Sequence, residues 1–433
     1  MRNEMAAAIG LAAWLVVPAA SQQPEAMDMP GMHRGMHHMN LAGMYQMDLA
    51  SGTSMNPQSW TMPMVMPRFG SWNFMFMAQA FFVDTQQSGP RGGDKLYSPN
   101  VLMVSAQHNL GRGSLMFETM FSLEPATVTG RSYPLLFQTG ETAYGRPLVD
   151  AQHPHNFIMA VAAHYARPIG GGVLQLYYAP VGDPALGPIA YPHRASAAEL
   201  PEAPLGHHWQ DSTHIADNVA TIGYKRAWLR VEASGFFGSE PDENRWHIDW
   251  GGMNSYSARI SATPSRNWLF QVSAGRLTRP ERQEPGDVVR STASMHYTRP
   301  LASGAAWSSS LIWGRDHSTF TGHNLNSYLA ETVYPVSRRD FLTGRVEVVD
   351  KDELFADNPA LEEQLDRTAG STFRVAGYTA GYTRDIAVVR ELETGVGVNV
   401  TAYTLPAAIQ PYYGAHPWGV NVFLRVRLTP GKQ

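Results

Sequence analysis

The stretch Trp228-Leu229-Arg230-Val231-Glu232-Ala233-Ser234-Gly235-Phe236-Phe237 alternates apolar and polar side chains, and this alternation decides the fold class. Successive side chains of an extended chain point to opposite sides, so the aliphatic residues share one face and the charged residues share the other. A period of two with charge on one side predicts a β-strand with one apolar and one hydrated face. The stretches 340–349 and 419–428 have the same pattern.

Outward from this stretch, the chain from residue 71 divides into segments of strand length, close to the 9–11 residues that a tilted membrane strand needs. The segments are 71–83, 100–109, 114–123, 157–166, 172–179, 218–225, 228–237, 253–263, 268–277, 289–299, 305–314, 324–334, 340–349, 373–384, 391–402 and 419–428. Short and long connections alternate between them, which is typical of outer-membrane barrels. We therefore predict an all-β fold, a transmembrane antiparallel barrel of about sixteen strands, spanning residues 71–433.

Composition agrees with this prediction and limits the function. Only 16% of the 433 residues are charged, against about 25% in ordinary soluble domains. The chain has no cysteine, which excludes disulfides and thiolate metal sites, and its net charge of −4 argues against a nucleic-acid partner. A soluble propeller or sandwich is the alternative fold, but no repeat of blade length is visible.

The N-terminus reads as an export signal. Arg2 precedes the apolar stretch 6–17, and small residues follow at 19–21, which predicts a signal peptide over residues 1–21. We therefore expect an outer-membrane protein of a two-membrane bacterium, in contact with lipid and with the barrel-assembly machinery.

Residues 22–70 are rich in methionine and histidine, and we predict a flexible periplasmic segment. Thioether sulfur is a soft ligand and imidazole an intermediate one, so such a tract suits copper(I) or silver(I). Its predicted ligands are Met27, Met29, Met32, His33, Met36, His37, His38, Met39, Met44, Met47, Met62, Met64 and Met66. A disordered tail with accidental bias is the alternative.

Charged residues on the predicted strands point into the barrel. A sixteen-stranded barrel encloses an aqueous lumen unless something fills it. The residues that we expect to line it are Arg230, Glu232, Arg345, Glu347, Glu393, Arg425 and Arg427. Both signs of charge occur, so no preference for anions or cations follows.

A second set of polar residues lies on the long connections, which we expect to meet at the outer rim. It comprises His153, His155, His193, His207, His208, Asp211, His214 and Asp217. These residues have the chemistry of transition-metal ligands, but loop histidines and aspartates also order loops through hydrogen bonds. Both roles are open. No motif of a known enzyme class appears, so we predict a protein that is not an enzyme.

Three motifs on these connections are similar to an uncharacterised family of bacterial outer-membrane proteins. They are Gln152-His153-Pro154-His155, Gly206-His207-His208-Trp209-Gln210-Asp211-Ser212-Thr213-His214-Ile215 and Glu240-Pro241-Asp242-Glu243-Asn244-Arg245-Trp246. The resemblance implies a barrel and transfers no activity. The segment 22–70 also resembles, in composition, the N-terminal part of the copper-resistance outer-membrane protein B.

Together these features predict an outer-membrane pore or conduit linked to copper or silver, with copper ions bound by the N-terminal segment and periplasmic copper proteins as partners. The alternative is an outer-membrane receptor or enzyme that holds a metal or ligand on its histidine-rich outer loops.

Overall fold

A computed structural model describes residues 39–281 and 285–429. Its sixteen long strands are antiparallel neighbours, and β20 pairs with β2 (Ala80 opposite Val426), which closes the barrel. The predicted barrel is therefore confirmed, strand by strand. The wall strands are β2 (Trp72–Gln87), β4 (Asn100–Leu110), β5 (Gly113–Phe121), β8 (Ile158–Ile169), β9 (Gly172–Gly182), β10 (Ala216–Arg226), β11 (Leu229–Phe237), β12 (Ser255–Ser265), β13 (Trp268–Leu277), β14 (Val288–Pro300), β15 (Ala306–Ser318), β16 (Asn324–Pro335), β17 (Asp340–Lys351), β18 (Phe373–Val389), β19 (Leu392–Thr404) and β20 (Trp418–Leu428).

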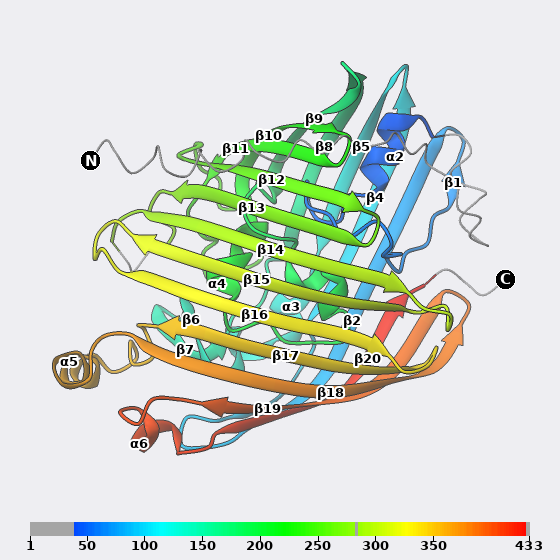
Figure 1. Cartoon of the computed structure of the whole chain (residues 1–433). Coiled ribbons are helices and arrows are strands. Elements are labelled where there is room, and N and C mark those ends of the chain that lie inside the picture. Colours follow the sequence, from blue (N-terminus) through cyan, green and yellow to red (C-terminus); the bar gives the residue numbers. More distant parts are fainter. Residues whose placement is uncertain (1–38, 282–284, 430–433) are drawn as a thin grey trace. The chain divides into compact units, whose positions relative to one another are not determined.

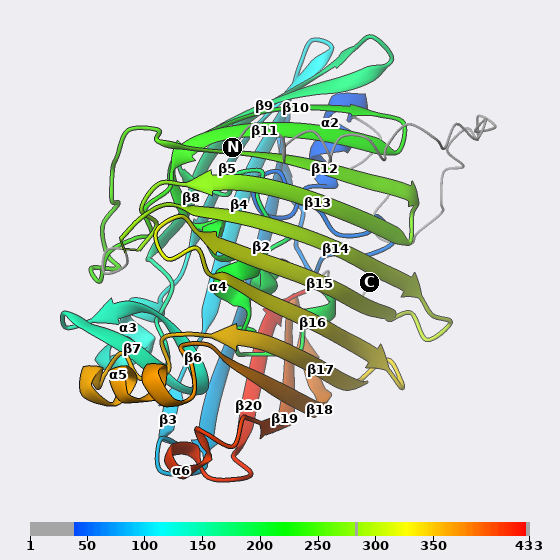
Figure 2. The ribbon, with the colours of Figure 1, turned by 60° about the vertical axis from the view of Figure 1, so that its left-hand side comes forward.

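The two ends of the barrel differ. Tight turns join the strands at one end, and the long connections gather at the other, on the left of Figure 1. The long connections carry the helices α3 (Glu124–Thr127), α5 (Pro359–Thr368) and α6 (Gln410–Tyr413). They also carry a separate hairpin of β6 (Tyr133–Ala143) and β7 (Arg146–Gln152), which lies near α5 in Figure 2. Two short strands, β1 (Arg68–Phe69) and β3 (Asp94–Tyr97), extend the sheet beside β2.

The outer face of the wall is apolar. Val231 is 49% exposed, whereas Arg230 and Glu232 on either side of it are buried inside, as the alternation requires. Exposed apolar side chains occur all around the barrel, among them Leu102, Phe117, Leu176, Ile222, Ile260, Val272, Leu311, Val346, Val398 and Val422. Apolar surface on this scale is stable only in contact with lipid, so the barrel spans a membrane. No helix in the described part of the chain is long and apolar enough to do so.

The interior is filled by the connection between β9 and β10. We call residues 183–215 the plug loop; within it Pro192, Ala198 and Ser212 are partly exposed and every other residue is buried. Helix α4 (His207–Gln210) of the plug loop packs against β14, β15 and β16. Gly314 on β15 makes this approach possible, because an added Cβ would lie 2.2 Å from the carbonyl oxygen of Trp209.

Charged residues of the wall hold the plug loop in place. Arg194 of the plug loop pairs with Glu331 on β16 (2.5 Å) and with Asp211 (2.9 Å), and all three side chains are buried. Arg345 pairs with Glu331 (3.0 Å) and donates to the carbonyl of Glu202. Specific buried ion pairs therefore hold the plug loop against the wall.

The predicted lumen residues lie on the inner face. Glu347 accepts a hydrogen bond from the Leu205 amide (2.6 Å). Arg425 and Arg427 both pair with Glu199 of the plug loop and with Glu393 on β19. Arg230 and Glu232 pair with each other at 3.2 Å. These side chains contact packed protein and one another, because the plug loop occupies the space that an open lumen would have.

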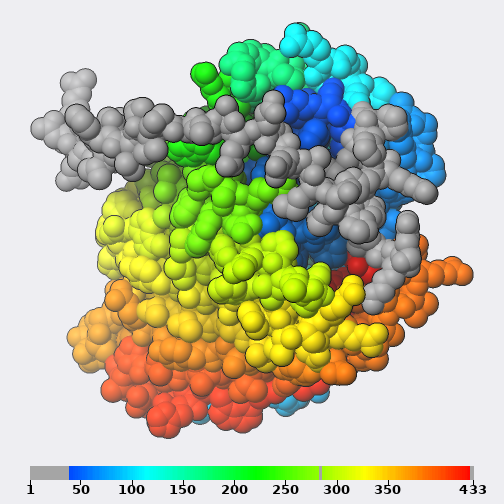
Figure 3. Space-filling model, turned by 45° about the vertical axis from the view of Figure 1, so that its right-hand side comes forward, coloured from blue at the N-terminus to red at the C-terminus, as the bar shows by residue number. Residues whose placement is uncertain are grey.

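A second filling element is the inner segment, residues 39–66. Its helix α2 (Leu41–Met47) begins at the tight-turn end, where the Asn40 side chain donates to the Gly113 carbonyl (2.8 Å). Residues 49–57 are all buried. Figure 3 shows dark-blue atoms of the inner segment beside the lighter-blue atoms of the first wall strands. The prediction of a flexible segment through residue 70 is therefore wrong for residues 40–66, because their apolar side chains pack inside the barrel. The predicted signal peptide and the ligands Met27 to His38 lie outside the described residues.

Candidate metal sites inside the barrel

Five of the predicted histidines form one buried group, which we call the histidine cluster: His153, His155, His207, His208 and His214. The plug loop supplies three of them, and the chain just after β7 supplies the other two. Ring centroids lie 5.6 Å apart for His153 and His208, 5.4 Å for His155 and His214, and 5.3 Å for His207 and His214. The sequence motifs 152–155 and 206–215 therefore meet in space.

Carboxylates orient three of these imidazoles. Asp211 lies 2.6 Å from Nδ1 of His207, and Glu124 lies 2.8 Å from Nδ1 of His155. Glu141 lies 3.0 Å from Nε2 of His153. A carboxylate on one ring nitrogen fixes the tautomer and leaves the other nitrogen with its lone pair, which is the usual second shell of a metal-binding histidine.

The surroundings set the charge of the cluster. Burial lowers the pKa of His153 to about 3 and holds the pKa of His214 well below its ordinary value, with His207 adding to the effect. Burial also lowers the pKa of His155, but the Glu124 carboxylate outweighs it and raises the pKa of that imidazole. Burial thus favours the neutral form of His153 and His214, and neutral imidazoles are the form that binds metal ions.

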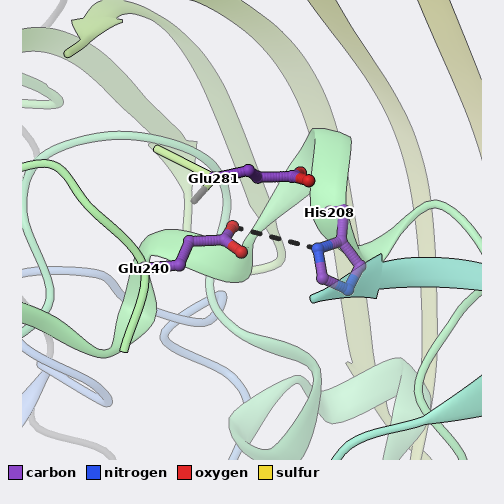
Figure 4. A group of neighbouring side chains, drawn as sticks. All are labelled: His208, Glu240 and Glu281. Atoms are coloured by element: carbon purple, nitrogen blue, oxygen red, sulfur yellow. Dashed lines mark ion pairs between the residues drawn. The ribbon is translucent and has the colours of Figure 1, made fainter. Parts of the chain in front are cut away.

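His208 belongs to a group of three residues whose ligand atoms lie within 4.8 Å of one another: His208, Glu240 and Glu281. Figure 4 shows the three side chains pointing toward a common point. Neither ring nitrogen of His208 makes a hydrogen bond to the described residues. Burial would raise the pKa of Glu240, but the interaction with His208 outweighs it and lowers that pKa to about 2. Glu240 and Glu281 come from the fourth and fifth long connections and were not among the predicted ligands.

A cavity of about 290 Å³ opens beside His208, lined also by Glu281 and Asp316; we call it the outer cavity. One imidazole and two carboxylates suit a borderline divalent ion such as zinc or copper(II). A second group, Asp242, His247 and Asp249, lies on a more exposed loop.

The remaining two predicted loop residues lie elsewhere. Asp217 belongs to strand β10, opposite Val181 and Phe237, and lies apart from the rings of the histidine cluster. His193 lies deeper in the barrel, where its Nε2 is 3.3 Å from the sulfur of Met120 on β5. Burial lowers the pKa of His193 to about 4.

Below His193, towards the tight-turn end, methionines of the inner segment meet methionines of the wall. They surround a cavity of about 20 Å³, roughly the space for one water-sized particle, and we call it the methionine pocket. Its methionines are Met47, Met62, Met64, Met75, Met77, Met103 and Met116. Among the other predicted ligands of this segment, Met66 packs beside the pocket and Met44 is exposed.

Two buried polar side chains accompany these thioethers. Glu118 on β5 lines the methionine pocket, is 1% exposed, and accepts no hydrogen bond from the described residues. His164 on β8 is fully buried, its Nε2 lies 3.6 Å from the Glu118 carboxylate, and neither ring nitrogen is hydrogen-bonded within the described chain. Buried polar groups are normally satisfied, so an unsatisfied pair suggests a missing ligand.

The wall methionines are unevenly placed. Of the seven on the wall strands, Met75, Met77, Met103, Met116, Met120 and Met159 point inward on four adjacent strands, β2, β4, β5 and β8, and Met295 on β14 is the seventh. These methionines were not predicted as ligands from the sequence, because an inward methionine on a strand looks like an ordinary apolar residue. Their confinement to residues 75–159 is the one signal that the sequence offered.

Comparison with known proteins identifies the fold of this chain and does not identify a family. No model of a known protein family matches the sequence, and no curated protein does. Among solved structures, an anion-selective porin from Comamonas acidovorans superposes with a TM-score of 0.51 at 13% identity, covering 83% of this chain and 99% of that chain. OmpT, an outer membrane protein of Vibrio cholerae, gives 0.49 at 8% identity over 84% of this chain and 100% of that chain. OprB of Pseudomonas putida gives 0.49 at 10% identity over 82% and 94%. The chain therefore has a porin-like barrel fold.

Proposed function

We propose that this protein is an outer-membrane barrel that binds and handles copper(I) or silver(I), with its tight turns in the periplasm. The porin-like barrel and its apolar outer face support the membrane location. The methionine pocket carries the link to metal, because seven thioethers around a space for one ion have no equal elsewhere in the described chain. The role is binding and passage of an ion rather than catalysis.

The chemistry of the pocket favours a soft monovalent ion. Thioethers bind copper(I) and silver(I) and bind hard ions poorly, since those prefer oxygen ligands. A buried cation is costly without a compensating charge, and Glu118 supplies one negative charge beside the neutral sulfurs. One carboxylate balances one monovalent ion.

The inner segment connects the pocket to the methionine-rich N-terminal tract. Met47, Met62 and Met64 follow the tract from Met27 to Met39 in the sequence, so the soft ligands of the tract and of the pocket belong to one stretch of chain. The compositional resemblance of residues 22–70 to the copper-resistance outer-membrane protein B supports the same role. Periplasmic copper proteins are the partners that we propose.

Silver titration of the full chain in detergent, followed by the NMR signals of ¹³C-labelled methionine methyl groups, tests this proposal. The signals of Met75, Met77 and Met103 should shift and saturate together. The double variant Met75→Leu/Met103→Leu, which nearly conserves volume, should lose one bound silver ion per chain by elemental analysis. The matched control Met253→Leu/Met295→Leu, outside the pocket, should not. Equal stoichiometry in both variants would remove the proposal.

A second candidate function rests on His208, Glu240 and Glu281 at the outer cavity. The convergence of their ligand atoms favours a receptor that captures a divalent transition-metal ion from outside. Equilibrium dialysis with zinc should show one site that His208→Ala abolishes and that His416→Ala, at an exposed histidine, retains. If both variants bind zinc like the parent chain, the three residues only order their loops.

A further inference from the structure

A series of thioethers and imidazoles leads across the barrel interior from the methionine pocket, at β2, β4, β5 and β8, to the outer cavity beside His208. We propose that a soft monovalent cation crosses the filled barrel along this series, exchanging one ligand for the next, with His193 as the step between the methionines and the histidine cluster. This inference rests on the proposed function, because it takes the same ion as its cargo.

The inner half of the series follows the register of the wall. Met116 on β5 lies opposite His164 on β8. Two residues further toward the long loops, Ser105 on β4 lies opposite both Met75 on β2 and Glu118 on β5. Another two residues toward the long loops, Met103 on β4 lies opposite both Met77 on β2 and Met120 on β5. Inward positions on one strand are about 6.6–6.8 Å apart, so each row is one short step from the next.

The middle of the series changes from sulfur to nitrogen. His193 of the plug loop lies 3.3 Å from the Met120 sulfur, and its Nδ1 makes no hydrogen bond to the described residues although the side chain is 4% exposed. Met159 and His155 line a common cavity of about 30 Å³ beside Tyr191, so an inward methionine of the wall and an imidazole of the histidine cluster border the same space.

The outer half runs through the histidine cluster. The ring of His155 is 5.4 Å from that of His214, which is 5.3 Å from that of His207. His207 is in turn 5.5 Å from His208, and His208 lines the outer cavity. The series therefore reaches from the tight-turn end to the end that carries the long loops.

The electrostatics along the series suit one positive charge. Carboxylates accompany it at Glu118 in the pocket, Glu124 beside His155 and Asp211 beside His207. Nδ1 of His193 and Nε2 of His214 make no hydrogen bond to the described residues, so these nitrogens are open to an ion. Each exchange forms one metal–ligand bond as another breaks, and no electron changes hands. Sodium, potassium and magnesium ions gain little from sulfur and nitrogen ligands, so the series excludes them.

Silver uptake into vesicles that contain the full-length protein tests the series, with trapped silver measured by elemental analysis. His193→Leu should reduce the initial flux at least tenfold, because it removes the imidazole that lies 3.3 Å from the Met120 sulfur and leads to the histidine cluster in the proposed route. His193→Met, which restores a soft ligand, should keep the flux within about threefold of the parent. His296→Leu is the matched control, because His296 is equally buried but hydrogen-bonds to Ser294 and Ser310 away from the series.

The outcomes separate this inference from the proposed function. Methyl shifts of the pocket methionines with no dependence of flux on His193 would overturn the series and leave the binding site in place. Silver bound in the pocket without any flux through the parent protein would also overturn it. Absence of silver from the pocket would remove the proposed function and the series together. Methyl spectra of each variant without silver show whether the barrel has folded.

Discussion

Because buried ion pairs hold the plug loop against the wall, we predict that the substitution Arg194→Met opens the barrel. Arg194 joins Glu331 on the wall to Asp211 in the plug loop, and its side chain and both partners are 0–1% exposed. The substitution keeps most of the apolar stem and removes the charge. Two buried carboxylates then lose a partner, although Arg345 still pairs with Glu331 and His207 with Asp211.

The size of the expected free-energy change follows from the burial of Arg194 and its two carboxylate partners. Removing one member of a buried ion pair costs about 3–5 kcal/mol, because the remaining charge is uncompensated. The strands of the wall keep their hydrogen bonds, so the loss should act on the seating of the plug loop. At about 1.4 kcal/mol per tenfold change, the equilibrium between seated and released plug loop should shift by at least a hundredfold.

Single-channel recording in planar bilayers measures this shift. We expect rare openings in the parent protein and at least a hundredfold higher open probability in Arg194→Met, with the same far-UV circular dichroism. The matched control is Arg367→Met, which breaks an exposed pair with Glu363 on α5 and should change nothing, because exposed pairs contribute little. A folded Arg194→Met barrel that stays as closed as the parent would show that this ion pair does not hold the plug loop in place.

Three further predictions concern pH, the outer cavity and the methionine pocket. Burial raises the pKa of Asp183 to about 8 and that of Glu202 to about 7, so both carboxyls favour the protonated form in the seated plug loop. Their contribution to seating is complete below about pH 4, where they are also protonated when released, and is lost as the pH rises through 7–8. Limited proteolysis of the plug loop should therefore accelerate between about pH 4 and 8 and level off above that range, and Asp183→Asn should weaken the rise; a flat profile in the parent would contradict this. Gly140→Ala should lower zinc affinity at the outer cavity at least tenfold in equilibrium dialysis, because Gly140 has a φ of 109° and an added Cβ would lie 2.8 Å from the His208 ring; unchanged affinity would show that His208 is not a ligand. Glu118→Gln should weaken silver binding in the methionine pocket at least tenfold while the same methyl signals shift, since it removes the compensating charge and keeps the shape; equal affinity would mean that the sulfurs alone hold the ion.

The wall of the barrel was readable from the sequence because its determinants are local. Lipid outside and polar groups inside impose a period of two on each strand, as in Arg230, Val231 and Glu232, and that period needs no knowledge of the neighbouring strands. The alternation of short and long connections is equally local. The predicted strand ends differ from the observed ends by a few residues, most at β18, which runs on to Val389 rather than ending at residue 384.

The proximity of the histidine motifs on the long connections could be predicted in part from the sequence. Histidines at 153, 155, 207, 208 and 214 stand out by composition, and the order of the long connections places them at one rim. The acids that complete their surroundings did not stand out. Glu124 and Glu141 lie in an irregular connection and in a hairpin that the sequence analysis did not predict, and Glu281 is a single acid on a polar loop.

By itself, the sequence determined that this chain forms a membrane-spanning barrel and that it carries an excess of soft ligands near its N-terminus. The positions of those ligands depend on long-range contacts of the folded chain. Residues 40–66 turn into the barrel because their apolar side chains find a packed interior there, and the plug loop leaves no open lumen. The pairing of β2, β4, β5 and β8 then brings methionines from distant positions around Glu118, since closure of a sheet sets contacts that no local pattern records.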